Sequence, residues 1–208
     1  MLRSQPIIMP EFKNALRGLP LKGRRVTVRS FSLADENLRQ AWAKFDDPYL
    51  SRYNFTPRQE ASNLVLYERL CDRIRLALDD PADNLIGYVF LKPFERDERA
   101  MEIGICLSAG HIGRGLGREA LELILPWAIE SLNLNRIVLD VDEINQRALR
   151  LYRRLGFKVS ALFWKKEDDS RIADYSKQIG LKHACRQRHG HLEILAWRME
   201  WSLNHTAA

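Results

Sequence analysis

The sequence has few cysteines and lacks long apolar runs. None of its runs reaches the ~18 residues that a membrane span requires. Among its 208 residues are three cysteines, Cys71, Cys106 and Cys185, which are scattered and odd in number. This use of cysteine is typical of a reducing compartment rather than of a disulfide framework. Residues 1–12 have only a short apolar patch broken by prolines, so we expect no signal peptide and a cytoplasmic protein.

Zinc-ligand spacing, repeats and low-complexity segments are missing as well. Four candidate ligands, His183, Cys185, His189 and His191, lie near one another, but no Cys-x-x-Cys pair accompanies them. We therefore expect no metal site. A chain of this length fits one domain with a sizeable core.

Negative charge falls short of positive charge. The formal net charge is +6 and the isoelectric point is about 9.4. Such a balance suits nucleic acid or a polyanionic small ligand. Basic residues are spread along the chain, with the densest patches at 22–29, 147–158 and 182–188. This spread favours a ligand site over nucleic-acid binding as the main function.

Hydrophobic periodicity predicts a mixed α/β chain. The predicted strands cover residues 24–29, 73–78, 85–93, 101–107, 136–141, 159–165 and 192–203. The predicted helices cover residues 34–45, 60–71, a long stretch after 117, and 146–155. Residues 1–20 are expected to form an irregular arm, and the polar residues 167–190 an insertion.

Local signals refine these helices. Ser32 or Asp35 is expected to cap the helix 34–45, and Gly156 to end the helix 146–155 as a left-handed cap. Pro126 lies within the long helix and is expected to kink it rather than to end it. The side chains expected to be buried are Leu38, Trp42 and Phe45 in the first helix and Ala120, Leu123, Ile124 and Trp127 in the long one.

A glycine-rich turn, Gly113-Arg114-Gly115-Leu116-Gly117, leads into the long helix. Glycines let backbone N–H groups approach a ligand closely. A helix N-terminus adds roughly half a positive charge and unpaired N–H donors. Arg114 and Arg118 add two full charges. The combination suits a phosphate or pyrophosphate, and the alternative is an ordinary strand-to-helix turn.

The stretch that begins with this turn resembles the acyl-coenzyme A site of the GNAT superfamily of N-acetyltransferases. That family has a Gln/Arg-x-x-Gly-x-Gly/Ala loop before a long helix, and later a strand ending near Asn and a helix ending Tyr-x-x-Leu-Gly-Phe. Here Ile112 to Gly117 match the loop, Asn145 the strand end, and Tyr152 to Phe157 the helix end. One departure is Ile112 in the Gln/Arg position, which in the family contributes largely through its backbone N–H.

The resemblance implies a GNAT fold, which is a mixed, mostly antiparallel sheet flanked by helices in a single domain. Two neighbouring strands, 101–107 and 136–141, would splay apart around the pantetheine arm of acetyl-CoA. It implies an N-acetyltransferase that acts by direct attack through a ternary complex, with acetyl-CoA as acetyl donor. The predicted cofactor-binding residues are Ile105, Cys106, Leu107, Ile112, Gly113, Arg114, Gly115, Leu116, Gly117, Arg118, Asn145 and Arg154.

The same resemblance assigns the proton chemistry. Tyr152 matches the general acid that protonates the leaving sulfur, and its alternative role is that of a half-buried helix tyrosine. Asn145 could equally be a helix N-cap, and Arg154 a solvated helix residue. Glu102 begins Glu-Ile-Gly-Ile-Cys-Leu, which is similar to the branch that acetylates ribosomal-protein N-termini, where the glutamate takes a proton from the acceptor ammonium. A surface-strand glutamate is the alternative.

The acceptor is expected to be a primary amine, either a protein N-terminus or a small molecule. Its pocket in this fold comes from the first two helices and the last strands, and residues 167–190 could add a lid. A homodimer is left open. Two rival functions remain, a non-catalytic acyl-coenzyme A-binding module and an RNA- or ribosome-binding protein.

Overall fold

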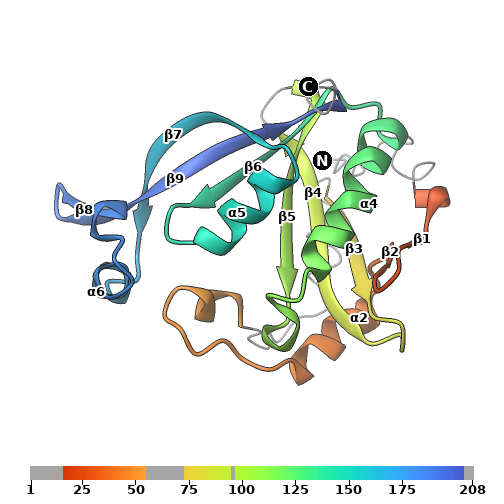
Figure 1. The fold of residues 1–208 in the computed structure, drawn as a ribbon, viewed down its shortest axis with the longest axis horizontal. Coiled ribbons are helices and arrows are strands. Elements are labelled where there is room, and N and C mark those ends of the chain that lie inside the picture. The colour runs from red at the N-terminus through yellow and green to blue at the C-terminus, as the bar shows by residue number, and fades with distance from the viewer. Residues whose placement is uncertain (1–15, 55–72, 95–96, 204–208) are drawn as a thin grey trace, which may run out of the picture. The chain divides into compact units, whose positions relative to one another are not determined.

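A computed structural model gives the fold of this chain (Figure 1). It describes residues 16–54, 73–94 and 97–203. The chain divides into two compact units, which we describe separately. Unit 1 comprises residues 1–44 and 55–137, and unit 2 comprises residues 45–54 and 138–208. The predicted helix 60–71 and most of the arm 1–20 lie outside the described residues.

Unit 1 contains an antiparallel sheet in the order β1-β2-β3-β4-β5. Its strands are β1 (Leu21–Lys22), β2 (Thr27–Ser30), β3 (Ile74–Asp79), β4 (Leu85–Phe94) and β5 (Asp97–Leu107). The predictions for β3, β4 and β5 are confirmed, although β5 begins four residues earlier than expected. The predicted strand 24–29 is observed as β2, which is shorter and begins later in the chain. The reason is a turn before it, in which the N–H of Gly23 donates to the carbonyl of Val26.

The long helix α4 (Leu116–Ser131) belongs to unit 1 (Figure 1). Pro126 lies inside it and does not end it, as predicted. Ala120, Ile124 and Trp127 are buried as expected, but Leu123 is only partly buried, and Leu121 and Leu125 are buried instead. The apolar face of α4 is therefore rotated slightly from the predicted one.

The first predicted helix, 34–45, is much shorter in the structure. It forms α2 (Leu33–Leu38) followed by a 3₁₀ turn, Arg39–Ala41, and Leu38 is exposed. Ser32 is the N-cap residue, and the Asp35 carboxylate accepts hydrogen bonds from its N–H and hydroxyl. The helix ends early because the Trp42 indole N–H donates to the carbonyl of Leu85 at 2.9 Å, which fixes Trp42 on the sheet.

Strand β6 (Arg136–Asp142) starts in unit 1 and ends in unit 2. Unit 2 then contains α5 (Gln146–Arg154), β7 (Lys158–Glu167), α6 (Arg171–Gln178), β8 (Cys185–Arg188) and β9 (His191–Trp201). The predictions for β6, α5, β7 and β9 are confirmed. Gly156 has φ +90°, so it ends α5 in the left-handed conformation as expected.

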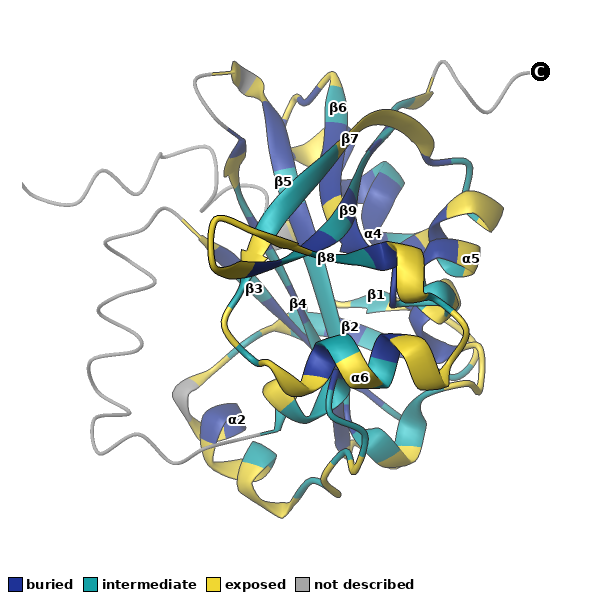
Figure 2. Ribbon diagram, turned by 90° about the vertical axis from the view of Figure 1, so that its left-hand side faces the viewer, coloured by how far each residue is buried: buried dark blue, intermediate teal, exposed yellow. Residues whose placement is uncertain are grey.

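The polar stretch 167–190 is a folded part of unit 2. The N-terminal half of β9 pairs with β7 through Lys165↔Ile194 and with β8 through Cys185↔Ile194. His189 and Gly190 both have positive φ and connect β8 to β9 in a tight hairpin. Figure 2 shows α6 with buried and exposed faces, and its buried residue Ile172 packs with Ile144, Ala184 and Ile194.

No helix among the described residues is long and apolar enough to cross a membrane. The cytoplasmic location stays a prediction. The expectation that 101–107 and 136–141 splay apart also stays a prediction.

Candidate active site

The glycine-rich turn of unit 1 has the backbone that a phosphate loop needs. Gly113 has φ +75° and Gly115 has φ +79°, a region in which L side chains are strained. Gly115 is the N-cap residue of α4, and the side of the turn at Gly113, Arg114 and Gly115 is exposed. A Cβ built at Gly113 would have no neighbour within 4 Å, so that side of the turn is open. The open side of the turn therefore lies directly before the N-terminus of α4, which suits a pyrophosphate.

Arg25 fixes this turn to the sheet and was not predicted. Its Nη1 donates to the carbonyl of Arg114 at 3.0 Å, and its Nε donates to Glu119 of α4 at 2.9 Å. A Cβ at Gly115 would lie 3.3 Å from Arg25 Nη2, so a guanidinium is close to the turn. The dense basic patch 22–29 was the only sequence signal for it. Arg118, by contrast, pairs with Glu122 at 2.8 Å, which offsets the charge expected of it at the phosphate.

The predicted pantetheine residues form the last part of β5. Ile105, Cys106 and Leu107 pair with Val89, Tyr88 and Gly87 of β4, and all three are only partly buried. Upstream, Met101 and Ile103 are buried. The end of β5 is thus more open than its buried middle. Burial raises the pKa of the Cys106 thiol, so this cysteine is a poor nucleophile at neutral pH.

Glu102 lies in the middle of β5, not at its start as predicted. It pairs across the strands with Lys92, whose ammonium lies 2.8 Å from its carboxylate. The side chain is 24% exposed. The geometry is that of a cross-strand ion pair on a partly open face, so a base function requires Glu102 to exchange this partner for water or for the acceptor.

The candidate residues of unit 2 begin at Asn145, between β6 and α5. Its side-chain oxygen accepts the N–H of Ala148 at 3.2 Å, so Asn145 is the N-cap of α5. Because one oxygen makes this cap, the amide NH₂ of Asn145 remains for another contact. Arg154 is exposed in the last turn of α5.

Tyr152 is buried on the inner face of α5. Its ring packs edge to face against Phe157, with centroids 5.6 Å apart. Burial, and then the neighbouring Tyr53 phenol, raise the pKa of Tyr152 above its ordinary value. A phenol with a raised pKa stays protonated throughout the neutral range, which is the state that a general acid needs.

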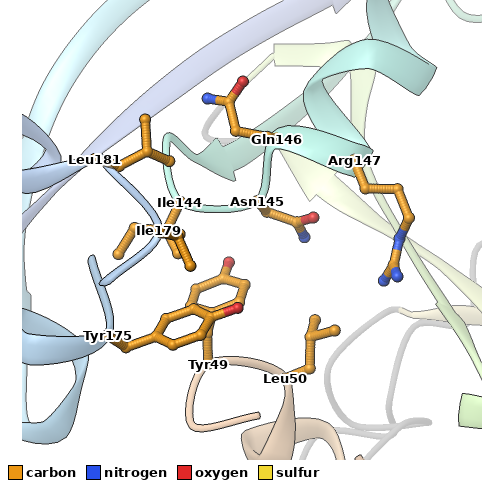
Figure 3. Close-up of a pocket in the computed structure, with 9 residues that line it drawn as sticks. All are labelled: Tyr49, Leu50, Ile144, Asn145, Gln146, Arg147, Tyr175, Ile179 and Leu181. Carbon is orange, nitrogen blue, oxygen red and sulfur yellow. The ribbon is translucent and has the colours of Figure 1, made fainter. Parts of the chain in front are cut away.

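A pocket of about 360 Å³ opens in unit 2 beside Asn145 (Figure 3). Three segments far apart in the sequence line it: the 3₁₀ turn Leu50–Tyr53 with the preceding tyrosine, the start of α5, and α6 with the residues after it. The lining residues are Tyr49, Leu50, Ile144, Asn145, Gln146, Arg147, Tyr175, Ile179 and Leu181. Apart from Asn145, none was predicted as a site residue, because no local motif marks them.

One wall of the pocket is held by a buried hydrogen bond. The Tyr49 hydroxyl donates to Asp142 at 2.9 Å, and the other carboxylate oxygen of Asp142 lies 2.7 Å from Lys165 Nζ. Burial is the main cause that raises the pKa of Tyr49, with Tyr53 and Asp142 adding to it. The ring of Tyr49 is therefore fixed in place as a neutral, rigid surface.

Comparison with known proteins defines the class. The family model of the acetyltransferase (GNAT) domain matches residues 25–158. The chain therefore belongs to the GNAT acetyltransferases, and it is an acetyl-CoA-dependent N-acetyltransferase. An uncharacterized N-acetyltransferase, p20, from Bacillus licheniformis is 28% identical over 167 residues, which are 75% of this chain and 86% of that protein.

Two further similarities concern proteins from Vibrio cholerae. A spermidine N(1)-acetyltransferase is 31% identical over 123 residues, which are 59% of this chain and 67% of that protein. A crystal structure of spermidine N-acetyltransferase in complex with CoA and spermine superposes with a TM-score of 0.60 at 20% identity. The superposition covers 89% of this chain and 100% of the chain in that crystal structure. The predicted fold, a mixed and mostly antiparallel sheet with flanking helices, is thus confirmed.

The structure brings the predicted site residues together in two groups. Unit 1 holds Ile105 to Leu107 and Ile112 to Arg118, and unit 2 holds Asn145, Tyr152 and Arg154. Within unit 1 the glycine turn and Arg25 are in contact. Within unit 2 Asn145 belongs both to the predicted cofactor residues and to the pocket.

Proposed function

We propose that this enzyme acetylates a primary amine by direct attack, with the pyrophosphate of acetyl-CoA held at the glycine turn of α4. The observation that carries the proposal is this turn, where Gly113 and Gly115 have positive φ, one side is open, and Arg25 lies close to the N-cap residue of α4. Arg114 adds an exposed cation, and the backbone of Ile105 to Leu107 would hold the pantetheine arm. Asn145 has an amide NH₂ left for the same arm.

Acetyl-CoA supplies an activated acetyl thioester. In the reaction the neutral acceptor nitrogen forms a bond to the acetyl carbon and the carbon–sulfur bond breaks. The nitrogen then loses a second proton, which passes through water and restores the phenol of Tyr152 after that phenol has protonated the sulfur. Tyr152 is proposed to give its phenolic proton to the departing sulfur. Its burial favours this role, because the raised pKa keeps the proton in place until a basic thiolate forms beside it.

Glu102 is proposed to take the proton from the acceptor ammonium, through water. Its exposed edge permits this, but the Lys92 ammonium at 2.8 Å competes for the same carboxylate. We therefore expect its contribution to be smaller than that of Tyr152.

The acceptor class is part of the proposal. The Vibrio cholerae relative is named for spermidine, so the comparison points to small amines rather than to the ribosomal-protein branch. The Glu102 to Leu107 sequence remains the feature that favours a peptide N-terminus. The homodimer likewise stays a prediction.

The test is ligand-induced thermal stabilisation together with turnover. A ligand at about 100 times its Kd stabilises the native state by about 2.7 kcal/mol. Acetyl-CoA should raise the melting temperature of the wild type, and Gly115→Asp should abolish the shift, since it adds a strained side chain and a negative charge at the phosphate.

A matched control is Gly180→Asp. Gly180 has φ +76° and no neighbour within 4 Å of a built Cβ, so the variant carries the same strain and charge outside the turn. It should keep the shift. An unchanged shift in Gly115→Asp would place the phosphate elsewhere. Binding without release of free thiol on any amine would instead favour the non-catalytic module, and salt-sensitive RNA affinity without any shift would favour the RNA-binding protein.

A further inference from the structure

The pocket beside Asn145 has walls of a distinct chemistry. Tyr49 and Tyr175 offer aromatic surfaces, and Leu50, Ile144 and Ile179 offer aliphatic ones (Figure 3). At about 30 Å³ for each water-sized group, its volume of about 360 Å³ holds roughly a dozen non-hydrogen atoms. This is the size of one aromatic amino acid.

The charged side chain in the pocket lining is a cation. Arg147 is exposed at the start of α5, on the opposite side of the pocket from Tyr175 (Figure 3). It has no ion-pair partner among the described residues. Burial and Asp47 raise the pKa of Tyr175, whereas Arg147 lowers it, so an acid and a guanidinium act on this phenol in opposite directions.

The other acids of this region are already engaged. Asp142 accepts from Tyr49 and pairs with Lys165, and Glu143 accepts from Gln146 and from the Trp197 indole. One oxygen of Asp47 accepts the N–H of Leu50 at 2.8 Å, which leaves the other for a ligand. The described pocket lining thus contains one guanidinium, that of Arg147, and no carboxylate, because Asp47 is not a lining residue.

From this arrangement, and given the proposed function, we infer that the acceptor is a free α-amino acid with an aromatic or branched aliphatic side chain. The side chain packs between Tyr49, Tyr175 and Ile179. The carboxylate lies at Arg147, with which it can form a charge-assisted, bidentate pair. The amine starts as an ammonium, and one of its protons passes through water to Glu102, as proposed above, before the nitrogen attacks.

A polyamine does not fit this pocket. Spermidine carries several positive charges and no carboxylate, so it would bring cations next to Arg147 and offer that guanidinium no anion. Its flexible chain also has no rings or branches to pack against the two tyrosines. This chain therefore differs in acceptor from the relative that is named for spermidine.

The experiment measures steady-state turnover by free-thiol release with three acceptors: phenylalanine, phenylalaninamide and spermidine. The wild type should give its highest kcat/KM with phenylalanine. Arg147→Gln should raise the KM for phenylalanine about tenfold, as expected for the loss of a charge-assisted contact, and should leave the KM for the amide nearly unchanged. Because both acceptors are tested on both enzymes, the difference in their amine pKa values cancels.

Arg150→Gln is the matched control. Arg150 is exposed on the same helix and outside the pocket lining, so the variant removes the same charge from α5. It should not raise the KM for phenylalanine. Equal increases in the two variants, or a higher kcat/KM with spermidine, would overturn the inference.

A binding measurement distinguishes failure of the proposed acetylation from failure of the inferred amino acid site. If no amine is acetylated, phenylalanine is titrated calorimetrically into the protein saturated with CoA. Binding that Arg147→Gln weakens and Arg150→Gln does not would support the pocket assignment without catalysis. Absence of binding in the wild type would overturn it.

Discussion

The two units keep their buried polar groups neutral in different ways. In unit 1, carboxylates are paired with arginines: Arg29 bonds Asp35 and Asp79, and Glu36 bonds Arg39 and Arg75. Unit 2 also has a paired buried carboxylate, Asp142 with Lys165, but in addition it buries two phenols, Tyr49 and Tyr152. Ion pairs give unit 1 fixed charge, whereas phenols give unit 2 uncharged groups that can still move a proton. This difference agrees with the proposal that the first unit binds the cofactor phosphates and that Tyr152 of the second is the general acid.

Loss of the Tyr152 hydroxyl should produce the largest effect. We expect Tyr152→Phe to lower turnover by roughly 10²-fold, which is typical of one general acid. The Phe157 contact needs only the ring, so the fold should be kept. The melting-temperature shift with acetyl-CoA should equal that of the wild type. Full turnover in this variant would make Tyr152 structural and assign the acid role to water.

Removal of one carboxylate from the unit 1 network should lower stability. The Asp35 side chain is 3% exposed and accepts hydrogen bonds from Arg29 and Ser32. Asp35→Asn should therefore lower the free energy of unfolding by about 2 kcal/mol, which is less than for a fully buried pair because Arg29 is 33% exposed. Urea unfolding measures this free energy. The control is Asp174→Asn, which breaks the exposed pair with Lys177 and should cost less than about 0.5 kcal/mol.

Glu102 is a test of whether unit 1 also contributes to proton transfer. We expect Glu102→Gln to reduce kcat/KM about tenfold near pH 6, at the weak end for a base that acts through water. The defect should shrink as pH rises, because more of the amine is then free. The pH profile is the measurement. A loss that does not vary with pH would make Glu102 a contact residue, and no loss would leave it as the partner of Lys92.

The pH dependence of stability should show the smallest effect and should differ in sign between the units. Burial opposes ionisation of Asp35, but hydrogen bonds from Arg29 and Ser32 outweigh it and lower its pKa. Its contribution is present above the unfolded pKa of about 3.9 and is lost as pH falls below that value.

The phenols of unit 2 act in the opposite direction. Burial raises the pKa of Tyr49 and Tyr152, so their contribution is present below the unfolded pKa of about 10 and is lost as pH rises beyond it. Urea midpoints measured from pH 3 to pH 11 test both effects. Asp35→Asn should reduce only the loss of stability at acid pH, and Tyr49→Phe only the loss at alkaline pH. A change in both effects in either variant would contradict the comparison.

The sequence predicted most of the elements whose signal is local. The glycine turn, α4, α5 and the left-handed Gly156 follow from residues next to one another, and so does the β4–β5 hairpin. The end of α2 was predicted wrongly, because Trp42 leaves the helical path for a hydrogen bond to Leu85, a residue distant in sequence. Periodicity contains no information about such a partner.

The missed parts of the candidate site have the same cause. Arg25 reaches the glycine turn from the bend between β1 and β2, and the pocket is assembled from Tyr49, Arg147 and Tyr175, which no motif connects. The stretch 167–190 was predicted to be an insertion because most of its residues are polar. Two buried residues, Ile172 and Ala184, suffice to pack it against β9.

The stretch 167–190, between β7 and β9, has an evolutionary consequence. Glu167 and Leu192 are register partners, so the two ends of the stretch meet on one ladder. A segment with adjoining ends can be exchanged for another of different length with little disturbance of the strands that carry it. It supplies Tyr175, Ile179 and Leu181 to the pocket, whereas the glycine turn belongs to the other unit. Given the inferred role of the pocket, replacement of this one segment would change the acceptor of the enzyme and keep the sequence of the glycine turn.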